Sequence, residues 1–169
     1  HYEQARRLGR RVAEELGYAV VTGGGPGIME AGNRGAYEAG GRSIGFPIKL
    51  PMEQTTNLYL TDEVPFYYFF SRKVVLAYSA EAYLYFPGGF GTLDELFEIL
   101  TLIQTEKMTR VPIILVGEDY WKPLDHFIKE TLLKEHKTIS PEDPDLYMIT
   151  DDEDKIMEII SNAPIKRKD

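Results

Sequence analysis

Short runs that favour β-strands alternate with helical segments along the whole chain. The runs YAVVT, RSIGFPI, NLYLTDEV, AYLYF, VPIILVG and DLYMIT are typical of strands, and most stretches between them repeat apolar residues at helical spacing. The run VPIILVG is apolar throughout, as in a strand that is covered on both faces. Such alternation predicts a parallel sheet with helices on both sides. We therefore expect an α/β fold, a Rossmann-like doubly wound parallel sheet, in a single domain over residues 1–169.

The spacing of apolar residues also places the helices. They are expected at about residues 3–16, 28–39, 66–79, 91–104 and 120–136, with a last helix opened by Asp151 and Asp152. Gly17 can end the first helix, and Pro26 stands at a plausible first position of the second. The buried face of helix 91–104 is expected to hold Leu93, Leu96, Phe97 and Leu100.

Charge and composition exclude several classes of function. The net charge of −8 argues against a general nucleic-acid binder, which needs a basic face. The chain has no cysteine, so it has no disulfide and no thiol chemistry, and a reducing cytoplasm suits it. The three histidines are scattered without metal-ligand spacing, so we expect no metal site. No apolar run approaches the roughly 18 residues of a membrane span, so we expect no membrane partner.

Two glycine clusters stand where a strand is followed by a helix. They are Gly23–Gly27 and Pro87–Thr92, and ligands of parallel sheets bind at such turns. Open backbone N–H groups and the helix dipole favour an anion there. Neither cluster is a Walker loop, because no Gly-Lys-Ser or Gly-Lys-Thr sequence occurs. Neither matches the dinucleotide fingerprint, and in the first cluster Ile28 stands where the third glycine belongs. Each cluster alone can be a simple tight turn. Two of them, one with a threonine hydroxyl, favour a phosphate site with these binding residues: Gly24, Gly25, Gly88, Gly89, Gly91 and Thr92.

Charged residues near the second cluster can be interpreted in two ways. Asp94 and Glu95 are expected in the first turn of a helix, where acids commonly complement the helix dipole. We prefer this interpretation for Asp94 and Glu98. Glu95 has a different role only if a cation faces it. Arg72 and Lys73 interrupt an apolar and aromatic helix. The local sequence by itself favours a solvated pair there.

Three motifs together resemble a known family. The stretch PGGFGTLDE resembles the P-G-G-x-G-T-x-x-E motif of the Lonely Guy-type family, the cytokinin riboside 5'-monophosphate phosphoribohydrolases and their bacterial relatives. Arg72 and Lys73 match the second motif of that family, and Arg72 stands 23 positions before Glu95. The stretch TGGGPGIMEA is similar to the family's first glycine turn. The resemblance spans essentially the whole chain.

The resemblance implies a reaction and the residues that serve it. Such enzymes hydrolyse the N-glycosidic bond of a purine nucleoside 5'-monophosphate, such as AMP or a cytokinin riboside 5'-monophosphate, to the free base and ribose 5-phosphate, without a cofactor. The glycine turns and Thr92 would hold the 5'-phosphate. Glu95 would bind the ribose hydroxyls and assist the attacking water where oxocarbenium character develops. Arg72 would orient Glu95 and the substrate. Lys73 would be a weaker candidate for contact with the phosphate or the base, and Glu53 in the preceding loop would touch the substrate.

Further expectations concern assembly, the chain start and rival functions. The aromatic-rich helix 66–79 and the resemblance both favour a homodimer in which each site borrows residues from its neighbour. The family normally begins with a further strand that ends in a Gly/Ser-rich turn; we expect either that this segment lies upstream of His1 or that this sequence has not retained it. The rival class is a non-catalytic nucleotide-binding or sensing module on the same fold. An NAD-dependent oxidoreductase ranks third, because the dinucleotide fingerprint is absent.

Overall fold

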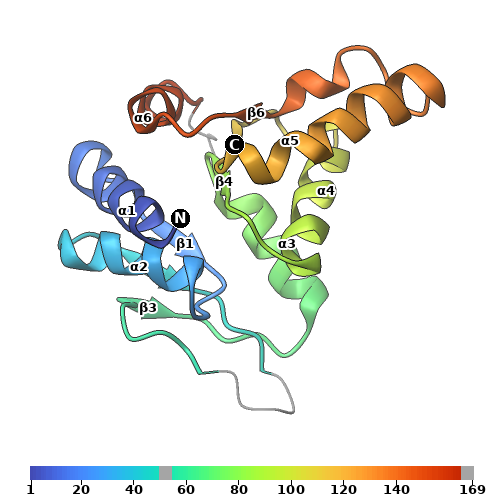
Figure 1. Ribbon diagram of the computed structural model, residues 1–169. Helices are drawn as coiled ribbons and strands as arrows, with labels where there is room; N and C mark the ends of the chain where they lie inside the picture. The colour runs from blue at the N-terminus through green and yellow to red at the C-terminus, as the bar shows by residue number, and fades with distance from the viewer. Residues whose placement is uncertain (50–54, 165–169) are drawn as a thin grey trace. The chain divides into compact units, whose positions relative to one another are not determined.

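The chain divides into two compact units, His1–Ala80 and Glu81–Asp169. The computed structural model describes residues 1–49 and 55–164. Both units contain helices and a three-stranded parallel sheet (Figure 1). The expected α/β fold with parallel strands is therefore confirmed. That the two units make up one domain stays a prediction.

The first unit is built on the sheet β1-β2-β3. In the parallel register, Val20 pairs with Ser43, Thr22 with Gly45, and Ile44 with Asp62. Its elements follow the order α1 (Tyr2–Leu16), β1 (Val20–Thr22), α2 (Ile28–Glu38), β2 (Ser43–Gly45), β3 (Asp62–Glu63) and α3 (Phe69–Ser79).

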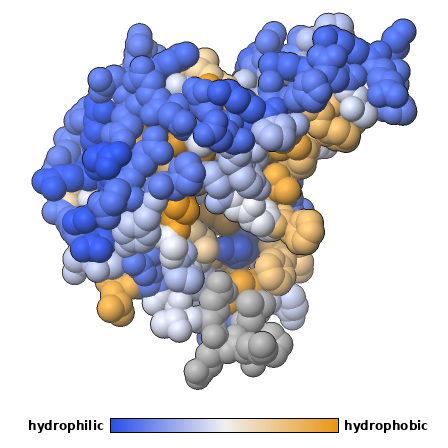
Figure 2. Space-filling model, in the orientation of Figure 1, coloured by the Kyte–Doolittle hydropathy of each residue, from blue (hydrophilic) through white to orange (hydrophobic). Residues whose placement is uncertain are grey.

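Helices α1 and α2 approach each other so closely that no side chain fits between their backbones at two glycines. A Cβ atom at Gly9 would collide with the carbonyl oxygen of Gly32, and a Cβ atom at Gly35 would collide with that of Arg6. Only glycine permits so close an approach. An ion pair of 2.7 Å between Arg6 and Glu38 adds to the contact. The outer surface of α1 is hydrophilic (Figure 2), and its buried residues are Ala5, Leu8 and Gly9.

The second unit is built on the sheet β4-β5-β6. All three residues of β5 are buried, as expected for a continuous apolar run. Trp121 is also fully buried, and its indole N–H donates to the carbonyl oxygen of Val116 at 3.0 Å. The elements are β4 (Tyr83–Tyr85), α4 (Phe90–Gln104), β5 (Ile113–Leu115), α5 (Glu118–His126), η1 (Phe127–Glu135), η2 (Asp143–Leu146), β6 (Met148–Ile149) and α6 (Glu153–Ser161).

Several helix boundaries agree with the sequence and others do not. Gly17 ends α1 in the left-handed conformation, and Asp152 caps α6 by accepting from the N–H groups of Asp154 and Lys155. Pro26, however, lies before the helix, because Gly27 is the N-cap of α2. Helix α3 starts at Phe69, three residues later than expected. The expected helix 120–136 runs as α5 and then as the π-helix η1, a rare form at this length.

The buried face of α4 also differs from the expected one. Leu96, Ile99 and Ile103 are buried, whereas Phe97 is 38% exposed. The buried residues Leu96, Ile99 and Ile103 follow the i, i+3, i+7 spacing of one helix face. Across residues 1–49 and 55–164, no helix combines the length and apolarity needed to cross a bilayer.

Candidate functional site

The first glycine turn joins β1 to α2. Gly24 and Gly27 adopt positive φ angles of 75° and 72°, which favour glycine at both positions. Gly24 and Gly25 are buried, and Gly27 is the N-cap of α2. The first N–H groups of this 11-residue helix therefore lie at the turn, together with the positive end of its dipole.

Arg72 lies against this turn within the first unit. A Cβ atom at Gly23 would collide with the Nη2 atom of Arg72, so the guanidinium fills the space that a side chain would need. The Nε–H group of Arg72 donates to the carbonyl oxygen of Phe46, just after β2, at 2.6 Å. An arginine stays protonated in proteins. The turn thus combines a fixed cation with a helix N-terminus. The next residue of α3, Lys73, is half-buried.

The second glycine turn joins β4 to α4. Gly89 is the N-cap of α4, and the N–H of Thr92 donates to its carbonyl oxygen at 3.1 Å. A Cβ atom at Gly88 would collide with the hydroxyl oxygen of Thr92. Added Cβ atoms at Gly89 or Gly91 would meet no described atom within 4 Å. The turn therefore places a hydroxyl beside the helix mouth and leaves its outer face open.

Tyr120 supports the second turn and was missed by sequence reasoning. Its hydroxyl donates to the carbonyl oxygen of Gly88 at 2.6 Å, from α5. This bond holds the Gly88 carbonyl on the side of α5. A tyrosine at the start of a predicted helix gave no signal of this role, because the contact joins residues 32 positions apart.

The acids of α4 lie deeper in the helix than expected. Because α4 begins at Phe90, Asp94 and Glu95 stand in its second turn, and the expected first-turn placement is wrong. Asp94 is exposed, whereas Glu95 and Glu98 are half-buried. The helix dipole acts mainly within the first turn. Simple dipole compensation therefore accounts less well for these acids than the sequence indicated.

Glu95 acts electrostatically on Tyr85, the buried last residue of β4. Burial, followed by the negative charge of Glu95, raises the pKa of the Tyr85 hydroxyl well above its usual range, and Tyr83 and Glu98 add to the effect. The Tyr85 hydroxyl is buried and has no hydrogen-bond partner among the described residues. The charge of Glu95 therefore acts on the strand that leads into the glycine turn.

The predicted site residues thus fall into two groups. The first unit brings Gly24 and Gly25 into the turn that Arg72 contacts, and the second unit carries the turn 88–92 with Glu95. Arg72 and Glu95 belong to different units, and their pairing stays a prediction. Glu53 lies outside the described residues. Within the described chain, no group of three or more histidine or acidic side chains is arranged to hold a metal ion.

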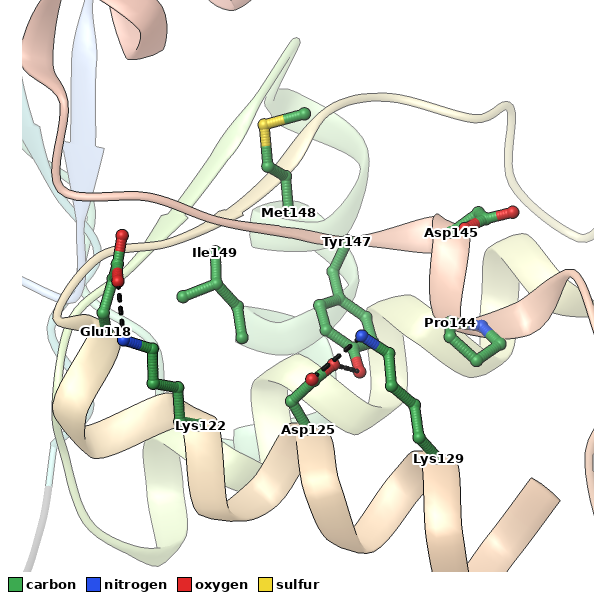
Figure 3. A pocket seen from close by; sticks show the side chains of 9 residues that line it. All are labelled: Glu118, Lys122, Asp125, Lys129, Pro144, Asp145, Tyr147, Met148 and Ile149. Atoms are coloured by element: carbon green, nitrogen blue, oxygen red, sulfur yellow. Dashed lines mark hydrogen bonds and ion pairs between the residues drawn. The ribbon is translucent and has the colours of Figure 1, made fainter. Parts of the chain in front are cut away.

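A separate hollow of about 390 Å³ lies between α5 and β6 in the second unit (Figure 3). Its two lysines are already paired with acids from the same helical turn. Lys122 contacts Glu118 at 2.8 Å, and Lys129 contacts Asp125 at 2.9 Å. Asp125 also accepts from the hydroxyl of Tyr147 at 2.7 Å. These partners neutralise one another, so the hollow has no net attraction for an anion such as phosphate.

The fold and the two turns define an α/β protein whose glycine-rich turns follow parallel strands. A family model described as "Possible lysine decarboxylase" matches residues 29–160. The chain belongs to this family, and the expected Lonely Guy-type membership is confirmed.

Two curated relatives carry the name that the motifs indicated. The cytokinin riboside 5'-monophosphate phosphoribohydrolase of Rhodococcoides fascians is 30% identical over 63 residues, which cover 37% of this chain and 32% of that protein. The enzyme of the same name, LOG7, from Arabidopsis thaliana is 39% identical over 62 residues, which cover 36% of this chain and 28% of that protein. The matched stretch thus spans about a third of each relative.

Solved structures show the same fold. The X-ray structure of TM1055, a structural-genomics target, is 32% identical with a TM-score of 0.55, over 67% of this chain and 61% of that one. The molybdenum cofactor binding protein of Rippkaea orientalis is 22% identical with a TM-score of 0.68, over 94% of this chain and 85% of that one. The molybdenum cofactor carrier protein of Chlamydomonas reinhardtii is 23% identical with a TM-score of 0.65, over 93% and 83%. At these identities the last two establish only the fold.

Proposed function

We propose that the protein hydrolyses the N-glycosidic bond of a purine nucleoside 5'-monophosphate, such as AMP or a cytokinin riboside 5'-monophosphate. The observation that carries the proposal is the second glycine turn. Its outer face is open, Thr92 places a hydroxyl at the mouth of α4, and half-buried Glu95 stands one helical turn further along. A phosphate can bind the N–H groups at that mouth. A sugar attached to this phosphate then reaches toward the carboxylate.

Glu95 supplies the charge that the reaction needs. As the bond between C1' and the purine nitrogen breaks, positive charge develops on the ribose ring, and a carboxylate stabilises it. Glu95 also accepts a proton from the attacking water. The hydroxyl forms the new bond to C1', the electron pair of the broken bond leaves with the purine, and the water proton replaces the sugar on the base. The products are the free base and ribose 5-phosphate.

Arg72 and the first glycine turn provide a second anion-binding surface. The guanidinium lies against Gly23, beside the N-terminus of α2. We assign it the role of orienting the substrate and Glu95, because an arginine that stays charged is a poor general acid. Gly24 and Gly25 would contact the substrate through this turn, Lys73 is a weaker candidate, and Glu53 completes the proposed set.

The exposed surface of α3 supports a homodimer. Tyr67, Tyr68, Phe69 and Phe70 are each more than half exposed, and Val74 and Tyr78 continue the apolar surface along the helix. Aromatic residues gathered in this way are typical of protein interfaces. Arg72 lies on the same helix, so a partner bound there would lie close to a proposed site residue. The lack of cysteine suits the cytoplasm as the compartment.

One experiment tests the proposal directly. The protein is incubated with AMP, GMP, IMP, a cytokinin riboside 5'-monophosphate and adenosine, and free base is measured by chromatography. We expect base and ribose 5-phosphate in equal amounts from at least one nucleotide, and no base from adenosine. The Glu95→Gln variant is the control for a contaminating hydrolase.

The alternative is a non-catalytic nucleotide-binding module. Fold does not fix function, and proteins named as molybdenum cofactor carriers have the same fold. If nucleotides bind to the protein and none of them is cleaved, this alternative replaces the proposed hydrolysis.

A further inference from the structure

Asn33 is a fully buried polar residue inside helix α2. Its exposed fraction is 0%, and it stands among small residues in the sequence EAGNRGA. A buried amide is costly unless its atoms are hydrogen-bonded. Asparagine is also a weak helix former. Its presence in the middle of α2 therefore requires compensation from its surroundings.

The carboxamide of Asn33 has partners at both ends. Its Oδ1 atom accepts from the hydroxyl of Thr22 at 2.5 Å and from the Nδ2 atom of Asn57 at 3.0 Å. Its Nδ2 atom donates to the hydroxyl of Ser43 at 2.9 Å. Asn33 thus joins the last residue of β1, the first residue of β2 and the segment that follows residue 54.

Two of these partners hold the first glycine turn. The hydroxyl of Thr22 accepts from the N–H of Gly24 at 2.9 Å. The backbone N–H of Asn57 donates to the carbonyl oxygen of Gly24 at 2.9 Å, and its side chain donates to that of Gly25 at 3.1 Å. Asn57 is itself buried. The carbonyl oxygens of Gly24 and Gly25 are therefore turned toward the protein interior.

The direction of these carbonyl groups matters for an anion. A carbonyl oxygen that faced the mouth of the turn would repel a phosphate, whereas outward N–H groups attract it. Thr22 and Asn57 fix this arrangement, and the Oδ1 atom of Asn33 fixes both of them. Asn33 itself lies beneath the turn in α2 and reaches it only through these two side chains.

We propose that Asn33 is a positioning residue that sets the phosphate affinity of the first glycine turn. It acts through Thr22 and Asn57 and does not contact the substrate. The proposal rests on the proposed function, because it assumes that the first glycine turn, the second anion-binding surface assigned above, also contacts the phosphate of the nucleotide. The hydrogen bonds that hold the backbone of this turn, such as that from the Gly24 N–H to Thr22, can be measured without any nucleotide.

The test compares Asn33→Leu with Ser43→Ala. Leucine has a similar size and removes both ends of the carboxamide. Ser43 is equally buried and bonds Asn33 on the side away from the glycine turn, so Ser43→Ala is a matched control for damage to the buried network. We expect both variants to lower Tm. Only Asn33→Leu should raise KM for AMP, by about tenfold, the factor for weakening one hydrogen bond to a charged group, with kcat changed less than about twofold.

Thr22→Val keeps the proposal testable if Asn33→Leu does not fold. Valine matches the shape of threonine and suits a strand, and it removes only the hydroxyl that joins Asn33 to Gly24. The Thr22→Val variant should also raise KM for AMP. If both variants fold, the double variant should be little worse than either single one, because the two residues act in series.

Amide hydrogen exchange by NMR provides a readout that is independent of nucleotide. The N–H of Gly24 should be protected in the wild type and in Ser43→Ala, and it should exchange at least tenfold faster in Asn33→Leu or Thr22→Val. Unchanged exchange in these two variants, or an equal rise of KM in Ser43→Ala, would overturn the proposal. If the wild type binds neither AMP nor inorganic phosphate, the proposed function fails, and the exchange rates still decide whether Asn33 positions the turn.

Discussion

Replacing Glu95 with glutamine separates catalysis from folding in this protein. The side chain stands in the second turn of α4, beyond the reach of most of the helix dipole. We therefore expect the substitution to change the free energy of unfolding by less than about 1 kcal/mol. For a chain of this size that corresponds to a shift in Tm of at most about 4 °C.

The expected effect on the reaction is much larger. Glutamine keeps the shape of the side chain and removes the charge that stabilises the oxocarbenium character at C1'. Loss of such a group typically costs about 10² to 10³ in kcat, or roughly 3 to 4 kcal/mol of transition-state stabilisation. Binding of AMP should weaken far less, because the charge on the sugar develops only in the transition state.

The assay measures adenine release at saturating AMP beside a thermal melt of each variant. Asp94→Asn is the matched control, since it removes the adjacent and exposed acid of the same helical turn. Arg72→Ala should lower kcat as Glu95→Gln does, and the double variant should be little worse than either. An active Glu95→Gln together with an inactive Asp94→Asn would refute the assignment of the acid.

Three further predictions concern binding, burial and assembly. AMP should raise Tm while adenosine at the same concentration raises it little, because the glycine turns recognise the anion; equal shifts would contradict a phosphate site. Tyr85→Phe should leave the free energy of unfolding unchanged or raise it, since it removes a buried hydroxyl that has no hydrogen-bond partner among the described residues. Tyr147→Phe, by contrast, loses a 2.7 Å hydrogen bond to Asp125 and should lower the free energy of unfolding by about 1 kcal/mol in a denaturant titration. Because burial raises the pKa of Tyr85 in the folded protein, its hydroxyl is neutral in both states below the usual pKa near 10. As pH rises above that value only the unfolded state gains by ionisation, so stability falls, and Tyr85→Phe should reduce that alkaline loss in melts between about pH 8 and 11. Light scattering at micromolar concentration should give the mass of a dimer, and Phe70→Ser on the exposed face of α3 should shift it toward the monomer; a monomeric wild type would remove the basis for shared sites.

The sequence predicted those elements whose local pattern permits only one arrangement. The apolar run VPIILVG became the buried strand β5, because no exposed strand can carry so many apolar residues. Gly17 and Asp152 ended and began helices by mechanisms that act within three or four residues.

Other features depend on contacts between distant residues. The start of α4 was misplaced because Gly89, a glycine N-cap without a side-chain acceptor, gives a weak signal. The contact between Tyr120 and Gly88 joins α5 to the second glycine turn, and nothing in either local sequence indicates it. Asn33 offered a faint signal, since a buried helix face rarely holds an amide without a specific partner.

The glycines between α1 and α2 should tolerate mutation less well than those at the mouth of α4. At Gly9 and Gly35 any side chain collides with backbone of the facing helix, so the two helices must separate to accept it. At Gly89 and Gly91 an added methyl group meets open space. A randomised library selected for protein abundance should therefore retain substitutions at Gly89 and Gly91 and lose them at Gly9 and Gly35. Selection of the same library for nucleotide hydrolysis should eliminate variants at all four positions, so the most intolerant glycines of this chain include two that lie outside its motifs.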